Sequence, residues 1–200
     1  MTEELEYQEG FYPGTRKELL QILEKELSPK RFRHVLGVEQ AAIHLARKNG
    51  ADVEKASIAG LLHDYAKERS PKEFKAKIKE HHMDPDLLNW GNFIWHGVVG
   101  AEIVRDELNI KDEEILNAIR RHTVGAVDMT TLDKIVYVAD FIEAGRDFPG
   151  VDLARAVAES SLDQAVIFET KHTIEYLMSQ DNAVYPEAIL TYNRWVAGRK

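Results

Sequence analysis

The chain has no cysteine among its 200 residues. This absence excludes disulfide bonds, thiolate-bound iron–sulfur clusters and catalysis by a thiol, and it fits a reducing cytosol. No apolar run approaches the ~20 residues needed to cross a bilayer. The acidic start Met1-Thr2-Glu3-Glu4 lacks the apolar core of a signal peptide. We therefore expect a cytoplasmic protein with no membrane partner.

Basic residues are in the minority. Lys and Arg number 26 against 34 Asp and Glu, so the formal net charge is −8. We expect no nucleic-acid partner, because no basic face would offset repulsion from the phosphates. A small phosphate ligand stays open if a metal and a few basic side chains line one pocket. The common phosphate-binding loops, G-x-x-x-x-G-K-[ST] and G-x-G-x-x-G, are absent.

Helix signals recur along the chain and few segments alternate with a period of two, so we predict an all-α fold in one compact domain. Residues 1–14 are expected to form a loose N-terminal lead-in, and residues 15–200 the domain. The expected helices start after Thr15 and Ser28, run from Asp52 to about Lys67, start after Ser70, Asp84 and His96, run from Asp112 to His122, start at Thr130, and fill 152–197 with two or three more.

The most informative residues are His34, the pair His63-Asp64, and Asp140. The pair closes the apolar run Ile58–Leu62, and Asp140 sits inside the apolar run 135–142. A carboxylate buried in such surroundings costs several kcal/mol, on the order of what an unpaired ion costs, unless a cation meets it. Imidazole and carboxylate together suit a divalent metal of intermediate hardness. These residues predict a metal-dependent enzyme acting on phosphate.

Further candidates surround this set. His96 lies among glycines that would let a ligand approach the backbone, and His122 ends an apolar helical stripe. Each histidine alone has a structural explanation, and so does Lys67, whose charge would favour a helix C-terminus. Arg146 lies in a loop fixed by Gly145 and Pro149-Gly150, the kind of segment that often carries binding groups. The remaining histidines, at positions 44, 81, 82 and 172, are interpreted as surface or bystander residues.

The pattern of these residues resembles the HD-domain metal phosphohydrolases, and within them the bacterial YqeK family. The resemblance covers roughly Ser28 to Asn193, and its most selective block is Gly145-Arg146-Asp147-Phe148-Pro149-Gly150. One departure is Ala144, where proline is expected. The other matching segments are Arg31–Val38, Ala59–Lys67, His122–Gly125, Leu132–Ile135 and Ala139–Glu143.

The resemblance implies an HD-domain helical bundle and an iron-type metal held by His34, His63, Asp64 and Asp140. Manganese, cobalt and zinc stay open as alternatives, and one ion is preferred, with a second at His96 and His122 left open. The expected catalytic residues are Asp64, Lys67, His96 and His122. The expected nucleotide-binding residues are Arg31, His34, Asp64, Tyr65, Ala66, Lys67, His96, His122, Arg146, Ala183, Val184, Tyr185, Pro186 and Glu187.

The implied reaction is symmetrical hydrolysis of diadenosine tetraphosphate to two ADP. Two alternatives stay open: a nucleotidase acting on nucleoside or deoxynucleoside monophosphates, and a nucleotide-binding sensor without turnover. The expected partner is a small dinucleotide or nucleotide. A homodimer through Phe74, Trp90, Phe93 and Trp95 and the choice between adenine and guanine are left open.

Overall fold

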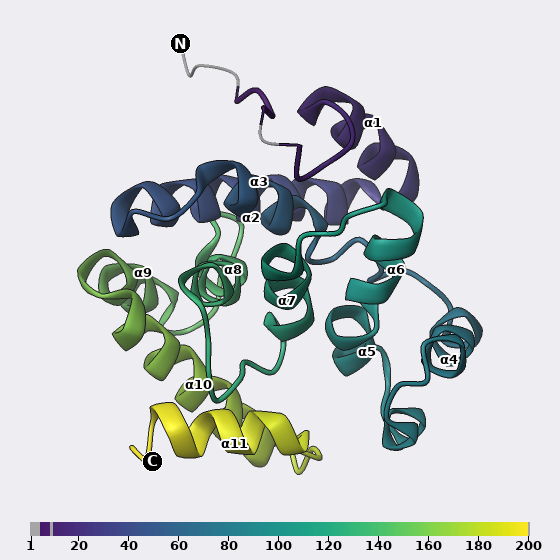
Figure 1. Cartoon of the computed structure of the whole chain (residues 1–200). Coiled ribbons are helices and arrows are strands. Elements are labelled where there is room, and N and C mark those ends of the chain that lie inside the picture. Colours follow the sequence, from purple (N-terminus) through teal and green to yellow (C-terminus); the bar gives the residue numbers. More distant parts are fainter. Residues whose placement is uncertain (1–4, 9, 200) are drawn as a thin grey trace.

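The computed structural model describes residues 5–8 and 10–199. The described residues form eleven α-helices and one short 3₁₀ helix, with no strand among them (Figure 1). In chain order they are α1 (Arg16–Glu26), α2 (Pro29–Asn49), α3 (Val53–Leu62), α4 (Pro71–Glu80), η1 (Pro85–Asn89), α5 (Asn92–Val98), α6 (Gly100–Leu108), α7 (Glu113–Arg121), α8 (Thr131–Ile142), α9 (Val151–Ser160), α10 (Leu162–Ser179) and α11 (Pro186–Trp195). The prediction of an all-α fold is confirmed.

Two helices, α3 and α8, are central because they are apolar around nearly their whole circumference. The long helix α2 packs against both, and α7 packs against both as well. In Figure 1, α1, α2 and α3 lie on one side of the bundle and α11 on the opposite side. Gly60 makes the contact between α2 and α3 close, because a Cβ there would lie 3.1 Å from the Cα of Glu39.

Side-chain caps set most helix starts. Capping boxes are present at Thr15 and Ser70, where two helices were expected to start, and Thr130 forms a third with Asp133. Ser28 caps α2, followed by proline at the first helical position, and Gly50 ends that helix in the left-handed region at φ +67°. Local sequence therefore determines these helix boundaries.

Two predicted boundaries were wrong, and both concern the site. The helix that starts at Asp52 ends at Leu62 instead of Lys67. Residues 63–68 form turns, in which backbone hydrogen bonds join residues three apart, such as Lys67 N–H to Asp64 O at 2.9 Å. His96 lies inside α5 rather than before a helix, and α6 starts only at Gly100. His63 and Asp64 therefore lie just past the last regular turn of α3.

The expected lead-in is irregular but anchored. The hydroxyl of Tyr7 is 2.9 Å from Ser57 Oγ on α3, and Tyr12 is buried. Residues 1–4, 9 and 200 of the two predicted ranges lie outside the described residues. Within the described part, no helix is long and apolar enough to cross a membrane.

The apolar residues offered for a homodimer interface are mostly internal. Phe74 and Trp95 are core residues whose rings pack together with centroids 5.6 Å apart. Only Phe93 is largely exposed, at 57%. These residues therefore form no continuous apolar surface.

Candidate metal and nucleotide site

The site forms where several helix ends meet. His63 follows the last residue of α3, and Asp140 lies in the last turn of α8. His122 follows the last residue of α7, and His34 lies near the start of α2. The C-terminal ends of helices carry partial negative charge, so three converging ends favour a cation between them.

The predicted quartet of His34, His63, Asp64 and Asp140 comes together, and we call it the metal quartet. His34 Nε2 is 3.3 Å from His63 Nε2, 3.5 Å from Asp64 Oδ2 and 3.1 Å from Asp140 Oδ1. His63 Nε2 is 3.5 Å from Asp64 Oδ2 and 3.8 Å from Asp140 Oδ1. Such spacings are those between neighbouring ligands of one ion bound at about 2.0–2.2 Å.

The tautomers of the two quartet imidazoles also suit a metal. The Nδ1–H of His63 donates to Gly60 O at 2.7 Å, and that of His34 donates to Glu143 Oε1 at 3.1 Å. Loss of the Nε2 proton on metal binding would direct a lone pair of each ring at the other ring and at the carboxylates. Two lone pairs and two carboxylates at one point need a cation, so the donor set fits a divalent metal.

A second cluster adjoins the first through Asp64. Its Oδ2 faces His34 and His63, whereas its Oδ1 is 3.4 Å from His96 Nε2 and 3.8 Å from His122 Nε2. The structure therefore brings both additional histidines of the sequence analysis to the quartet. Asp64 can serve both clusters because it follows the end of α3, where the turns present its two oxygens to different sides.

Burial and neighbouring charge perturb these groups strongly. Burial lowers the pKa of His96 to about 4 and that of His122 to about 3, so both rings are neutral at physiological pH. Burial works against ionisation of Asp64, but the neighbouring His63 holds the pKa of that carboxyl well below its usual range. Asp140 also has a lowered pKa, because the hydrogen bond from His34 and the charges of His63 and Arg146 outweigh burial. Both acids are carboxylates available to a metal.

Three cations border the quartet. Arg31 Nη1 is 2.5 Å from Asp64 Oδ2, and Arg146 pairs with Asp140 through both the carboxylate and the backbone carbonyl. Lys67 Nζ is 3.1 Å from His96 Nε2, and burial lowers the pKa of this ammonium group. The Lys67 side chain thus lies beside His96, and its backbone lies in the turns that follow α3.

Two cavities open beside the quartet. The first, of about 350 Å³, has a polar end at Lys67, His96, His122, Asp140 and Arg146. Its other walls are largely apolar and include Phe93, Ile94, Phe141, Phe148, Leu177, Ala183, Tyr185 and Ala188. A polar end beside a metal and an apolar end suited to a flat ring are what a nucleotide requires.

The second cavity, of about 810 Å³, lies between α2 and the loop after α8. Its walls include Arg31 and His34 from the helix and Glu143, Arg146 and Phe148 from α8's end and the loop. Arg146 and Phe148 belong to the walls of both cavities.

Several site predictions are not supported by side-chain positions. Tyr65 is buried and donates its hydroxyl proton to Glu107 Oε2 at 2.7 Å, so it points toward α6 instead of the site. Ala66 is buried against Gly100, since a Cβ added to Gly100 would lie 3.2 Å from the Ala66 methyl group. Neither side chain is among the described walls of the two cavities, because this turn faces α6.

The C-terminal stretch is only partly at the site. Ala183 and Tyr185 line the smaller cavity, whereas Val184, Pro186 and Glu187 do not. Pro186 instead starts α11, and the Glu187 carbonyl accepts a hydrogen bond from Thr191 at 2.9 Å. Gly97, beside His96, was expected to leave room for a ligand. A Cβ on Gly97 would lie 3.3 Å from the His122 ring, so the His122 side chain occupies this space.

Two carboxyl groups at the site were missed by sequence reasoning. Glu143 accepts hydrogen bonds from His34 and from the Gly145 amide, so it orients the His34 ring. Its place after the helix of Asp140 was the available signal. Glu169 lines the smaller cavity, and its Oε2 is buried without a hydrogen-bond partner among the described residues. Burial raises the pKa of Glu169 well above its ordinary value.

The surroundings of His172 differ from the expectation, whereas those of Asp133 agree with it. His172, interpreted as a surface residue, stacks on Phe168 with centroids 6.1 Å apart and also contacts Phe141 and Phe148. For Asp133 the sequence favours a capping box with Thr130 over a role in orienting a histidine. The structure has this capping box at the start of α8, and Asp133 also pairs with Arg121 at 2.5 Å. The stacked rings support Phe141 and Phe148, both of which line the smaller cavity.

Comparison with known proteins agrees with this geometry. A model of the HD domain family matches residues 31–145. The symmetrical bis(5'-nucleosyl)-tetraphosphatase of Bacillus subtilis is 45% identical over 183 residues, covering 92% of this chain and 98% of that protein. A protein of the same name from Halalkalibacterium halodurans is 40% identical and covers 92% of this chain and 99% of its own length.

A solved structure is also similar. It is described as a predicted HD superfamily hydrolase involved in NAD metabolism from Clostridium acetobutylicum. It superposes with a TM-score of 0.86 at 32% identity, covering 92% of this chain and 97% of that one. Since the family model spans more than half of the chain and the relatives align along most of it, the chain belongs to the HD domain family, among the symmetrical bis(5'-nucleosyl)-tetraphosphatases.

Proposed function

We propose that this enzyme hydrolyses diadenosine tetraphosphate symmetrically into two molecules of ADP. The observation that carries the proposal is the metal quartet bordered by Arg31, Lys67 and Arg146 and opening into a cavity with an apolar end. A metal, phosphate charges and a nucleoside are thereby accommodated in one continuous site. Two relatives that are 45% and 40% identical to this chain carry the name of this activity.

The metal would be held by His34, His63, Asp64 and Asp140, and we propose iron, with manganese, cobalt and zinc accepted by the same ligands. When bound, such an ion supplies Lewis acidity toward a phosphoryl oxygen and lowers the pKa of a coordinated water. We retain one ion as the resting state. The Nε2 atoms of His96 and His122 and the Oδ1 atom of Asp64 are all acceptors, so this position supports a second ion.

The protein's own groups would neutralise and orient the substrate. Arg31 and Arg146 each lie against a quartet carboxylate, so their remaining N–H groups are within reach of phosphate oxygens beside the metal. Lys67 adds a third positive charge from the turn after α3. In the reaction, water oxygen bonds to one inner phosphorus, and the bridging bond to the other inner phosphate breaks. One ADP then contains the water oxygen, and the other leaves with the bridging oxygen.

The test is product identification with purified protein. Diadenosine tetraphosphate should yield ADP alone on anion-exchange chromatography, at two ADP per substrate consumed. Appearance of ATP with AMP would contradict symmetrical cleavage. Release of orthophosphate from nucleoside monophosphates without ADP from the dinucleotide would support the nucleotidase alternative. ADP binding in a calorimeter without turnover would support the sensor.

The metal is tested separately by elemental analysis of protein purified without added metal. One equivalent of iron per chain is expected, and a metal-free active enzyme would contradict the assignment of the quartet. The cytoplasmic location and the lack of a nucleic-acid partner stay predictions from composition.

A further inference from the structure

We propose that the larger cavity, between α2 and residues 143–148, binds the second nucleoside diphosphate half of the substrate, with Lys30 and Arg33 as phosphate-binding residues that the sequence analysis did not identify. The smaller cavity then holds the first half. This inference rests on the proposed function and names the part of the protein that the second half would contact.

The position of the two cavities carries the first step. His34 lines the larger cavity and Asp140 the smaller one, and their ligand atoms are 3.1 Å apart. The metal quartet therefore lies at the boundary between the cavities. The cavities also share Arg146 and Phe148 as walls. Cleavage of a central bond requires that bond to lie at the quartet, so equal lengths of substrate must extend to both sides.

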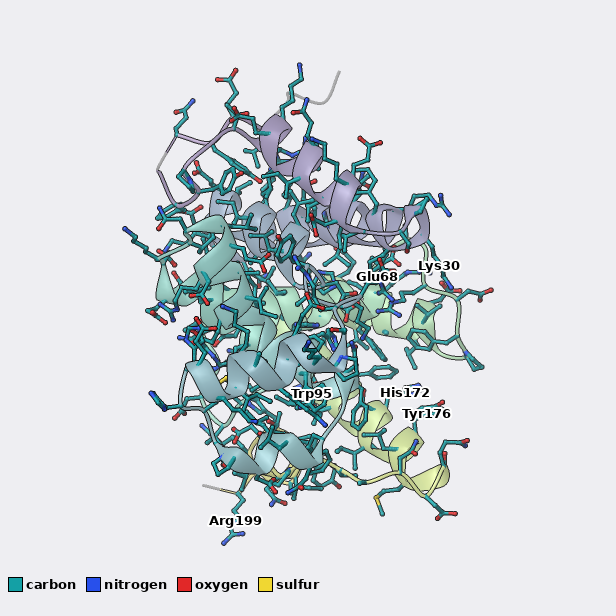
Figure 2. All side chains as sticks on the ribbon, turned by 90° about the vertical axis from the view of Figure 1, so that its right-hand side faces the viewer. Lys30, Glu68, Trp95, His172, Tyr176 and Arg199 are labelled. Atoms are coloured by element: carbon teal, nitrogen blue, oxygen red, sulfur yellow. The ribbon has the colours of Figure 1, made fainter. Side chains whose placement is uncertain are left out.

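The charge of the larger cavity carries the second step. Lys30, Arg31, Arg33 and Arg146 contribute four positive side chains to its walls, against the acids Glu143 and Asp147. Arg31 and Arg146 face the quartet, whereas Lys30 and Arg33 are exposed and have no ion-pair partner among the described residues. Figure 2 shows Lys30 projecting from the surface on the same side as Glu68.

The acids in this cavity do not cancel the positive charge. Glu143 is buried, with its carboxylate occupied by the His34 ring at 3.1 Å and the Gly145 amide at 2.6 Å. Asp147 is exposed and is the one acid left to oppose the two unpaired cations. In a protein with a net charge of −8, a cavity with unpaired Lys and Arg beside a metal site is complementary to phosphate.

Size and shape carry the third step. At about 810 Å³ the larger cavity falls in the range of roughly 300–1,000 Å³ typical of small-molecule sites. Leu36, Gly37 and the Phe148 ring offer apolar surface beyond the charged part, and Gln40 offers a polar group next to them. The larger cavity thus offers both cations for phosphate groups and less charged surface for a nucleoside, as the smaller one does.

The test uses the double variant Lys30→Gln/Arg33→Gln in the full-length, metal-loaded enzyme. The matched control is Lys25→Gln/Arg47→Gln, which removes the same charge from exposed positions on α1 and α2 outside both cavities. We expect KM for diadenosine tetraphosphate to rise roughly tenfold in the first variant and to stay within twofold in the control. Metal content should be unchanged in both.

ADP titration provides a readout independent of turnover. Wild-type protein should bind two ADP per chain with unequal affinities, and the Lys30→Gln/Arg33→Gln variant should lose the weaker event only. An unchanged KM together with unchanged ADP stoichiometry would refute the inference while leaving the proposed function intact. Absence of ADP production by the wild-type enzyme would refute the proposed function, and the ADP stoichiometry would then still test the cavity.

Discussion

The Nε2 atoms of His96 and His122 lie 3.1 Å apart, although neither carries a proton. His96 donates through Nδ1 to Asn92 O, and His122 donates through Nδ1 to Ile119 O at 2.7 Å. The repulsion between these two opposed lone pairs is relieved by a cation or by a hydrogen-bond donor from a ligand. The Lys67 ammonium group is such a donor for His96 Nε2, whereas His122 Nε2 has no such donor among the described residues.

This arrangement predicts separate roles for His122 and the quartet. His122→Gln should lower kcat by roughly 100-fold, the scale of losing one group that stabilises developing charge. The first metal should stay at one per chain, since the four quartet ligands are untouched. Steady-state kinetics and elemental analysis on the same preparation check both parts. Loss of the first metal would place His122 among its ligands instead.

Asp64 is the residue that links both clusters. Asp64→Ala should abolish metal binding and activity, because Oδ1 and Oδ2 face different histidine pairs. Helical content should be largely unchanged, since Asp64 lies after the end of α3. Elemental analysis, activity and circular dichroism check this prediction. Metal retained at full stoichiometry would refute the ligand assignment.

Lys67 tests the binding of phosphate. Lys67→Ala should weaken ADP affinity by roughly tenfold, the effect of losing a charged hydrogen bond, with metal content unchanged. Calorimetric titration with ADP checks this. The exposed Lys72→Ala, on α4, is a control for loss of positive charge. Equal affinity of Lys67→Ala and wild type would remove Lys67 from the nucleotide site.

Glu143 is predicted to act through His34. Glu143→Gln should lower metal affinity by about 10–100-fold, because the amide no longer fixes the ring with a charge-assisted hydrogen bond. Glu143→Asp should restore part of the affinity only if the shorter side chain still reaches Nδ1. Competition with a chelator measures the metal dissociation constant. A change in kcat with unaltered metal affinity would argue against this positioning role.

Glu169 predicts a pH dependence of stability. Burial, helped by the charge of Asp140, raises the pKa of Glu169 in the fold, while Arg146 opposes this. The unfolded chain loses the proton near the ordinary pKa of 4.5, and the folded chain retains it, so stability falls as pH rises above 4.5. Glu169→Gln removes this penalty, so its unfolding temperature should exceed that of wild type by more at pH 8 than at pH 5.

Thermal unfolding followed by circular dichroism at several pH values checks this prediction. Glu187→Gln, on α11, controls for loss of one negative charge. A difference between Glu169→Gln and wild type that is constant with pH would show that Glu169 is ionised in the fold.

Sequence patterns alone located most helix starts and the four residues that the fold brings together in the quartet. Capping residues such as Thr15, Ser70 and Thr130 act within one turn of their own backbone, so local reading identifies them. The quartet was recognisable because carboxylates in apolar runs require a cation, whatever the tertiary arrangement. The glycine and proline residues around Arg146 marked its loop as a candidate binding segment, and the structure has Arg146 paired with Asp140.

Tertiary structure alone decided how these groups meet. The two oxygens of Asp64 serve separate histidine pairs because α3 ends at Leu62 and a run of turns follows, a boundary that the apolar pattern extended too far. The His122 ring occupies the space beside Gly97, and the Tyr65 hydroxyl contacts Glu107. Both contacts depend on how α5 and α6 pack against the neighbouring elements, which residue spacing does not predict. Contacts such as Glu143 with His34 join residues more than 100 positions apart, and only packing of the whole chain specifies them.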